Sequence, residues 1–394
     1  MTPEAPIRTL LESNRIRWRV ARIALLAVFG FVCLRALVHA QAFRDSAWPR
    51  TDFDQALVAL DEITSGGPPR DGIAPIDEPS FDSVSDAALW LDAREPVIVL
   101  SVGSQTRAYP IQILIWHEIV NDTVGGVPVS VTFCPLCNAS IVFDRRVDGR
   151  LLDFGTTGKL RKSDMVMYDR QTESWWQQFT GRAIVGELAG TVLERLPASI
   201  VAFEDFERAY PDAPVLSRRT GHRRDYGNNP YRGYDTITDR PFLFFDPVDE
   251  RLPAMERVLS ISVGDRHKLY PFSLFKTEPL IHDRLGELPI IVMSRKGTLS
   301  ALDATRIARS RTVPSATAYD RRLDGRTLSF AIRDGRIVDE QTGSTWNLFG
   351  AATSGPLARR QLATVDSGVH FAFAWLAFNP HSEIAKPQKG VGGK

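Results

Sequence analysis

The feature that most constrains the fold of this chain is a series of short segments that occurs twice in the same order. The segments, each with its second copy, are Tyr109-Pro110 and Tyr270-Pro271, Pro128–Val131 and Pro289–Val292, Asp144–Arg150 and Asp320–Arg326, and Gln171–Ser174 and Gln341–Ser344. Their spacing varies between 161 and 176 residues, which indicates an internal duplication with insertions. Two copies are too few for a solenoid, so we expect two related lobes that pack together.

Short β-branched runs alternate with turn residues from position 95 onward, which is typical of a β-rich α+β body. We expect strands at 97–102, 127–133, 140–144 and 151–154, and helices at 111–120 and 204–209. The predicted organisation is a signal or anchor segment at 1–42, a loop-rich lead at 43–95, a first lobe at 96–211, an inter-lobe loop at 212–256, a second lobe at 257–385 and a tail at 386–394.

The N-terminal segment indicates export from the cytoplasm. Basic residues at 15–22 precede an apolar run at 23–34, and Ala40-Gln41-Ala42 follows as a cleavage-like site. The run of 12 residues suits a signal peptide and is too short to span a bilayer alone, although an uncleaved signal anchor remains an alternative. Either reading predicts a periplasmic or membrane-anchored body, with the membrane as a partner through this segment.

Charge and composition exclude several classes. The 48 Lys and Arg residues balance 47 Asp and Glu residues, so the net charge of +1 gives no reason to expect nucleic acid as a partner. Three cysteines cannot support a disulfide-rich scaffold. No Ser-His-Asp, paired-carboxylate or dinucleotide-binding motif stands out, so the sequence leaves open whether the protein is an enzyme, as well as its substrate or protein partner.

The strongest chemical signal is Cys134-Pro135-Leu136-Cys137. A thioredoxin-like site needs a long helix after the motif, whereas residues 138–144 are typical of a strand. A strand, a Cys-Pro-x-Cys turn and a second strand resemble a metal knuckle. Asn138 occupies the position after the turn, where a residue that tolerates positive φ is needed.

Two thiolates need further ligands to hold a metal. His117 is the expected third ligand, with Glu118 or Asp122 as its hydrogen-bond partner. Met167 is a further candidate, since it shares one face of a predicted strand with Met165. Such a soft donor set suits copper or zinc. At the 161-residue shift, the residues that face His117, Cys134 and Cys137 in the second copy are Glu278, Arg295 and Thr298. The chemistry is therefore predicted in the first lobe alone.

Two alternatives need no metal. The cysteine pair could form a thiol/disulfide redox couple, because exported cysteines readily oxidise. Alternatively, the pair is inert, and the protein is a ligand-binding or scaffold module that uses the polar, tyrosine-rich loop at 222–231 for recognition.

Several long motifs resemble the prokaryotic family known as domain of unknown function 3179. They are Ser65–Pro68 with Asp71–Ile73, Tyr109-Pro110, Trp116–Asp122, Thr132–Asn138, Phe154-Gly155, Val166–Arg170 and Tyr226 with Asn229–Tyr231. The resemblance runs from about residue 60 to Phe378. It implies an exported or membrane-tethered prokaryotic protein with a shared Cys-Pro-x-Cys and His-Glu signature, and it supplies no function.

Overall fold

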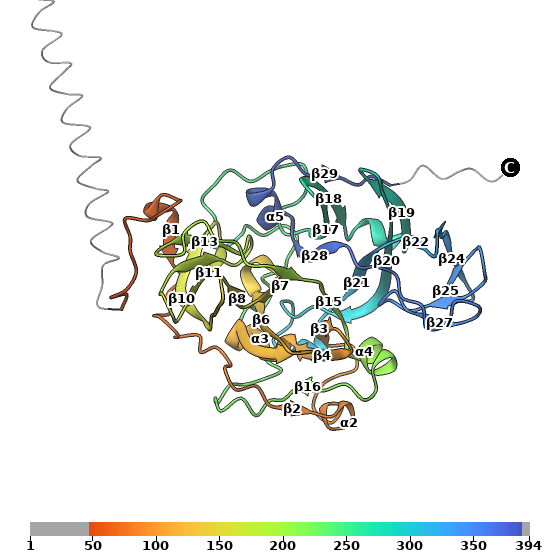
Figure 1. Cartoon of the computed structure of the whole chain (residues 1–394), viewed down its shortest axis with the longest axis horizontal. Helices are drawn as coiled ribbons and strands as arrows, with labels where there is room; N and C mark the ends of the chain where they lie inside the picture. The colour runs from red at the N-terminus through yellow and green to blue at the C-terminus, as the bar shows by residue number, and fades with distance from the viewer. Residues whose placement is uncertain (1–46, 388–394) are drawn as a thin grey trace, which may run out of the picture.

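The computed structural model describes residues 47–387, so the predicted signal or anchor segment and Cys33 lie outside the described residues. The described chain is rich in β-strands and has a few short helices, in agreement with the β-rich α+β prediction (Figure 1). Within residues 47–387, none of the helices is both long and apolar enough to cross a membrane.

The first half of the body contains three sheets. The first sheet has, in spatial order, β15 (Ala198–Ala202), β3 (Pro96–Val102), β4 (Gln105–Pro110), β16 (Val215–Leu216) and β2 (Phe81–Asp82). The second has β14 (Arg195–Leu196), β7 (Ala139–Asp144), β6 (Val127–Cys134) and β5 (Ile119–Val124). The third has β1 (Ile63–Ser65), β10 (Phe154–Arg161), β11 (Asp164–Asp169), β12 (Trp175–Gln177) and β13 (Arg182–Val185). The remaining elements are η1 (Leu60–Glu62), α2 (Val84–Ala87), α3 (Ile111–His117), η2 (Pro135–Cys137), the β8 (Arg146–Val147) and β9 (Arg150–Leu151) hairpin, and α4 (Phe203–Ala209).

The second half also contains three main sheets, in the same chain order. The first of these has, in spatial order, β28 (Asp366–Phe371), β17 (Arg257–Val263), β18 (Arg266–Pro271) and β29 (Glu383–Ile384). The second has β19 (Leu280–Leu285), β20 (Leu288–Leu299) and β21 (Thr312–Asp320). The third has β24 (Phe330–Arg333), β25 (Arg336–Asp339), β26 (Thr345–Trp346) and β27 (Ala352–Ser354). The other elements are η3 (Leu274–Lys276), η4 (Ile307–Arg309), the β22 (Arg322–Leu323) and β23 (Arg326–Thr327) hairpin, and α5 (Ala372–Phe378). Each half has one short parallel pair, β4 with β16 and β18 with β29, among otherwise antiparallel strands.

Three predicted boundaries differ from the structure. The helix expected at 111–120 ends at His117, because Glu118 adopts φ 58° and Ile119 begins β5 by pairing with Thr132. The strand expected at 151–154 is interrupted, since β9 ends at Leu151 and β10 begins at Phe154. The first sheet also extends beyond the expected lobe boundary at residue 211, because β16 pairs with β4.

The repeated Gln-Thr-x-Ser segments have a structural role in both halves. Asp169 accepts hydrogen bonds from the backbone N–H of Thr172 at 2.6 Å and from the indole N–H of Trp176 at 3.0 Å. Asp339 accepts the same pair of bonds from Thr342 and Trp346, at 2.6 and 3.0 Å. In each half, a buried carboxylate thus closes a tight turn and orients a core tryptophan.

Replacement of either carboxylate by an amide tests this role. We expect Asp169→Asn to lower the free energy of unfolding by ~1–3 kcal/mol, because an amide cannot accept on both sides and leaves a buried donor unsatisfied. Asp339→Asn should have a similar effect, whereas Asp61→Asn on the exposed 3₁₀ turn should change stability by less than ~0.5 kcal/mol. Urea denaturation of the three variants measures this. Equal stability of all three would contradict the assigned role.

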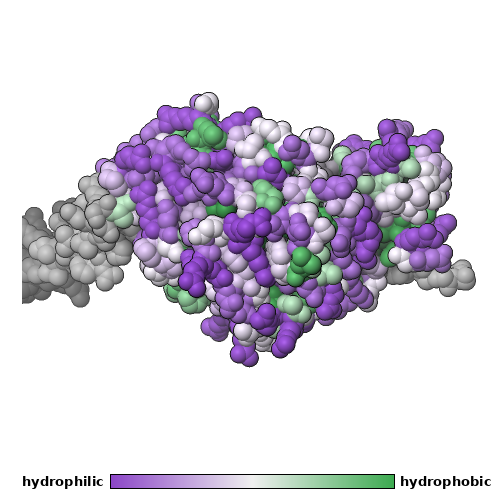
Figure 2. All heavy atoms as spheres, turned by 90° about the horizontal axis from the view of Figure 1, so that it is seen from below, coloured by the Kyte–Doolittle hydropathy of each residue, from purple (hydrophilic) through white to green (hydrophobic). Residues whose placement is uncertain are grey.

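The two halves pack together through a common hydrophobic core. One buried cluster joins Val99 and Phe206 of the first half to Ile291, Tyr319 and Trp346 of the second. In Figure 1 the orange-to-green half accordingly lies directly against the cyan-to-blue half. The face of the molecule in Figure 2 is mainly hydrophilic, with separate small hydrophobic groups.

The segment at 217–256 connects the halves without a regular strand or helix. Tyr226, Tyr231 and Tyr234 from this segment pack against a buried cluster that contains both cysteines and residues of both halves. The inter-lobe loop is therefore ordered against the two halves together.

Candidate metal centre

The Cys-Pro-Leu-Cys motif forms a turn between two antiparallel strands. β6 ends at Cys134, the 3₁₀ turn η2 follows, and Cys134 pairs with Ala139 at the start of β7. Asn138 adopts the left-handed conformation with φ 48°. The predicted strand, knuckle and strand are confirmed, and no long helix follows the motif.

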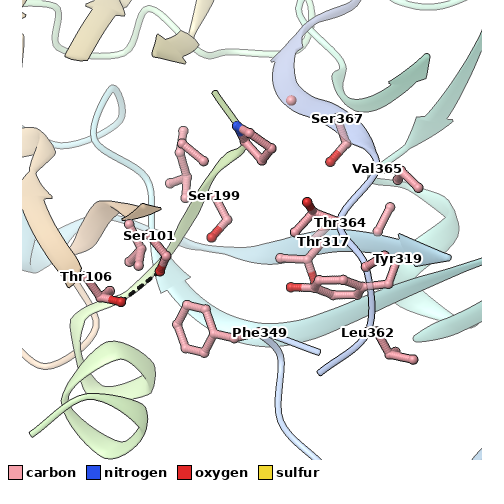
Figure 3. A pocket seen from close by; sticks show the side chains of 18 of the residues that line it. Ser101, Thr106, Ser199, Thr317, Tyr319, Phe349, Leu362, Thr364, Val365 and Ser367 are labelled. Atoms are coloured by element: carbon pink, nitrogen blue, oxygen red, sulfur yellow. Dashed lines mark hydrogen bonds between the residues drawn. The ribbon is translucent and has the colours of Figure 1, made fainter. Parts of the chain in front are cut away.

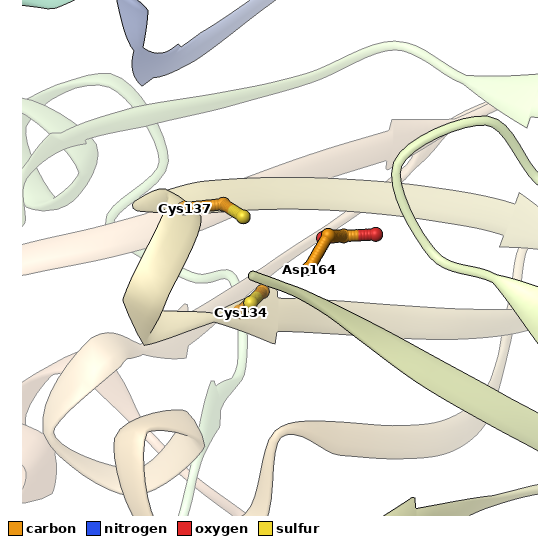
Figure 4. A group of neighbouring side chains, drawn as sticks. All are labelled: Cys134, Cys137 and Asp164. Atoms are coloured by element: carbon orange, nitrogen blue, oxygen red, sulfur yellow. The ribbon is translucent and has the colours of Figure 1, made fainter. Parts of the chain in front are cut away.

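Asp164 is the third member of the cysteine group. The ligand atoms of Cys134, Cys137 and Asp164 all lie within 4.8 Å of one another, and all three residues are buried (Figure 4). Asp164 begins β11 directly after a tight turn in which Lys162 and Ser163 have φ values of 54° and 63°. This turn also brings the Ser163 carbonyl oxygen to 3.4 Å from the Cys137 sulfur.

The Asp164 carboxylate is held on one side only. Its Oδ2 accepts hydrogen bonds from the Gln177 amide at 2.6 Å and the Phe179 backbone N–H at 2.8 Å. Its Oδ1 is buried and has no hydrogen bond of standard geometry among the described residues, and the Cys134 and Cys137 thiols are the further groups that interact with this carboxylate. A buried polar atom without a partner is costly, so this oxygen is suited to a cation or a ligand.

Burial makes the anionic forms of this group unfavourable. Desolvation raises the pKa of Asp164 to about 6. Desolvation also raises the pKa of the Cys134 thiol, and the nearby Asp164 carboxylate adds to the effect. The Cys137 thiol pKa is raised well above its ordinary value, by burial and then by its neighbour Cys134. Without a cation, the two thiols therefore retain their protons at neutral pH, whereas the Asp164 carboxyl, with a pKa of about 6, is mainly ionised.

The side chains of the adjacent residues His117 and Glu118 lie in different environments. The His117 Nδ1–H donates to the Ala74 carbonyl oxygen at 2.6 Å, and Nε2 accepts from the Tyr226 hydroxyl at 2.6 Å. Burial lowers the pKa of His117 to about 4, which keeps the ring neutral. Both ring nitrogens are thus engaged, and the structure places His117 outside the cysteine group in which it was expected. His117 instead links the lead segment to the inter-lobe loop.

The expected partners of His117 have other roles. Asp122 accepts hydrogen bonds from Arg107 at 2.6 Å and from the Tyr109 hydroxyl at 2.6 Å. Glu118 is buried, and burial raises its pKa to about 8, with the charge of Asp164 as a second cause. The carboxyl of the His-Glu pair, rather than the imidazole, is thus electrostatically coupled to the cysteine group.

The two methionines of β11 pack in the hydrophobic cluster that also contains Cys134 and Cys137. Met167 pairs across the sheet with Thr156 and Trp176. Met165 lines a cavity beside the cysteine turn. The role of Met167 as a metal ligand stays a prediction.

A cavity of about 580 Å³ lies next to this group. Leu136, between the two cysteines, forms part of its wall together with Glu118 and Met165. The opposite side comes from the inter-lobe loop, through Tyr231 and Tyr234. The size falls in the usual range of small-molecule sites, so the cavity can admit water or a small ligand to the neighbourhood of the thiols.

The corresponding region of the second half has different chemistry. β20 continues through this position with a bulge between Arg295 and Thr298. Arg295 forms an ion pair with Asp205 at 2.7 Å, and Thr298 bonds to the Ser315 hydroxyl. Among the described residues, the cysteine–carboxylate group therefore occurs only in the first half.

Sequence reasoning did not identify Asp164. The available signal was a carboxylate at the head of Asp164–Asp169, a strand whose six residues are all buried. Burial of an acidic side chain requires compensation, and this would have marked Asp164 once β11 was known to start beside the knuckle.

The comparisons with known proteins give a family. A search of curated proteins and a search of solved structures both found no match. A family model described as a protein of unknown function, DUF3179, matches residues 70–382, which include both halves and the cysteine group. The chain therefore belongs to the DUF3179 family of proteins of unknown function.

Proposed function

We propose that the protein binds a transition-metal ion through the thiolates of Cys134 and Cys137 and the carboxylate of Asp164. The observation that carries this proposal is the convergence of three buried acidic donors, whose ligand atoms all lie within 4.8 Å of one another. A divalent cation would replace the protons that burial otherwise holds on the two thiols, and would neutralise the charge of the Asp164 carboxylate.

The donor set favours zinc over copper. Thiolates bind both Cu(I) and Zn(II), but a carboxylate oxygen is a harder donor that suits Zn(II) better. Three protein ligands also leave a coordination position for water or a ligand, as in catalytic rather than structural zinc sites.

Elemental analysis of protein purified under reducing conditions and incubated with zinc tests the proposal. We expect about one equivalent of zinc in the native protein, and a loss of zinc affinity by about 100-fold or more in Cys134→Ser and in Asp164→Asn. Asp205→Asn provides a buried carboxylate control outside the group and should retain zinc. Zinc well below one equivalent in the native protein, or equal affinity in the Cys134→Ser variant, contradicts the proposal.

The electrostatics count against a thiol/disulfide exchange function. Reactive cysteines are partly exposed and have lowered pKa values. Cys134 and Cys137 are free thiols here, but both are buried and have raised pKa values. Burial and a raised pKa keep a thiol from acting as a nucleophile, whereas a bound metal ion can still displace the thiol proton.

We also infer that the halves arose by internal duplication and that residues 1–42 direct export or anchor the body to a membrane. The shared order of sheets and the matched Asp169 and Asp339 turns support the duplication. In this arrangement the first half carries the metal chemistry and the second provides structural support.

A further inference from the structure

We propose that a second cavity, between the two halves, binds a neutral polyhydroxylated ligand of the saccharide class. This cavity of about 690 Å³ lies between β3 and β15 of the first half and β21 and β28 of the second (Figure 3). It shares no lining residue with the cavity beside the cysteines. Interfaces between structural units are common positions for small-molecule sites.

The wall of this inter-half cavity is polar without being charged. Ten of its side chains carry a hydroxyl group, and none is Asp, Glu, Lys, Arg or His. A charged ligand would lose its hydration there without gaining a countercharge, which is strongly unfavourable. The lining therefore selects against ions and charged metabolites.

Several of these hydroxyl groups have no hydrogen-bond partner within residues 47–387. The side chains of Ser199, Thr364 and Ser367 are in this state and point into the cavity in Figure 3. An apolar ligand would leave these groups unsatisfied, whereas the hydroxyls of a sugar can donate to them and accept from them.

Aromatic side chains form one side of the same cavity. The rings of Phe349 and Tyr319 lie there in Figure 3, and Tyr210 packs edge-on against Phe349 with ring centroids 5.1 Å apart. The hydroxyls of Tyr319 and Thr317 already bond to the Leu348 carbonyl oxygen, so these side chains are fixed in place. A rigid aromatic surface beside free hydroxyls matches a sugar ring, which has apolar C–H faces and a polar edge.

Isothermal titration calorimetry with the whole exported body tests this proposal. The probes are maltose, cellobiose and trehalose, with glucose 6-phosphate as a charged comparator and 1-octanol as an apolar comparator. We expect at least one neutral disaccharide to bind and both comparators to fail. Thr364→Val and Ser367→Ala each remove one hydroxyl with little change in shape and should weaken binding by about threefold to tenfold.

Thr305→Val, at an exposed position outside the cavity, is the matched control and should leave affinity unchanged. Thermal unfolding of each variant verifies that the fold is retained. The proposal is overturned if none of the three disaccharides binds at ~10 mM, if both cavity variants bind as the native protein does, or if glucose 6-phosphate or 1-octanol binds more tightly than the disaccharides.

Discussion

Asp235→Ala is expected to lower the free energy of unfolding by ~3–5 kcal/mol, because it leaves a buried guanidinium without its counterion. Asp235 has no exposed side-chain surface and lies 2.7 Å from Nη2 of Arg257, whose side chain is only 9% exposed. It also accepts a hydrogen bond from Ser300 and pairs with Arg311. This one carboxylate therefore fastens the inter-lobe loop to the second half. Urea unfolding monitored by tryptophan fluorescence measures the loss.

Two further variants separate the buried charge from a general effect of losing a carboxylate. Asp249→Ala, which removes the partly exposed partner of Arg251, should cost less than ~1 kcal/mol. Combining Asp235→Ala with Arg257→Met removes both charges and should recover part of the loss, since a paired buried charge is costly mainly when one partner remains. If the double variant is less stable than Asp235→Ala, the explanation by an uncompensated charge is wrong.

His370 is expected to make the protein acid-sensitive. Burial lowers the pKa of His370 to about 3, and the positive charge of Arg195 adds to this effect. Its ring packs against both Phe179 and Trp375, with centroid distances of 4.9 and 5.4 Å, and those two rings also contact each other. Between the unfolded pKa of about 6.5 and the folded value of about 3, only the unfolded chain binds the proton. Stability contributed by this residue is thus complete above pH 6.5 and falls by ~1.4 kcal/mol for each pH unit below it.

His370→Phe should flatten this dependence, because phenylalanine keeps the ring packing and cannot bind a proton. We expect the variant to lose less unfolding free energy than the native protein between pH 6.5 and 4.5. Urea unfolding at several pH values within this window measures the two slopes. His381→Gln, at an exposed position, should leave the native slope unchanged. Parallel slopes for His370→Phe and the native protein would refute the assignment.

The parts of the fold that the sequence predicts best depend on local patterns. The run Val97–Leu100 has no polar interruption, and it forms the buried part of β3. Asn138 was expected to tolerate positive φ, and it adopts φ 48°. Glu118 could not be anticipated in this way, because a glutamate rarely adopts its φ of 58° and only the pairing of β5 with β6 requires it.

The group of Cys134, Cys137 and Asp164 was predicted only in part, because local patterns specify the two cysteines and not the carboxylate. The two cysteines lie in one local turn, so their proximity follows from the motif itself. The third donor depends on which distant strand meets that turn, and sequence spacing does not specify this contact. His117 is closer in sequence to the cysteines than Asp164 is. Its ring nevertheless lies elsewhere, because it forms tertiary hydrogen bonds with Ala74 and Tyr226.

The turn formed by Lys162 and Ser163 has a consequence for how quickly a bound ion exchanges with solution. The Ser163 carbonyl lies against the cysteine sulfurs, while its hydroxyl bonds to the Phe242 carbonyl of the inter-lobe loop. An ion bound at the thiols as proposed would therefore be enclosed by two segments that are joined to each other. Its residence time would be governed by the frequency with which this hairpin and loop separate, so uptake and release would be slow even for a metal that the donors hold weakly.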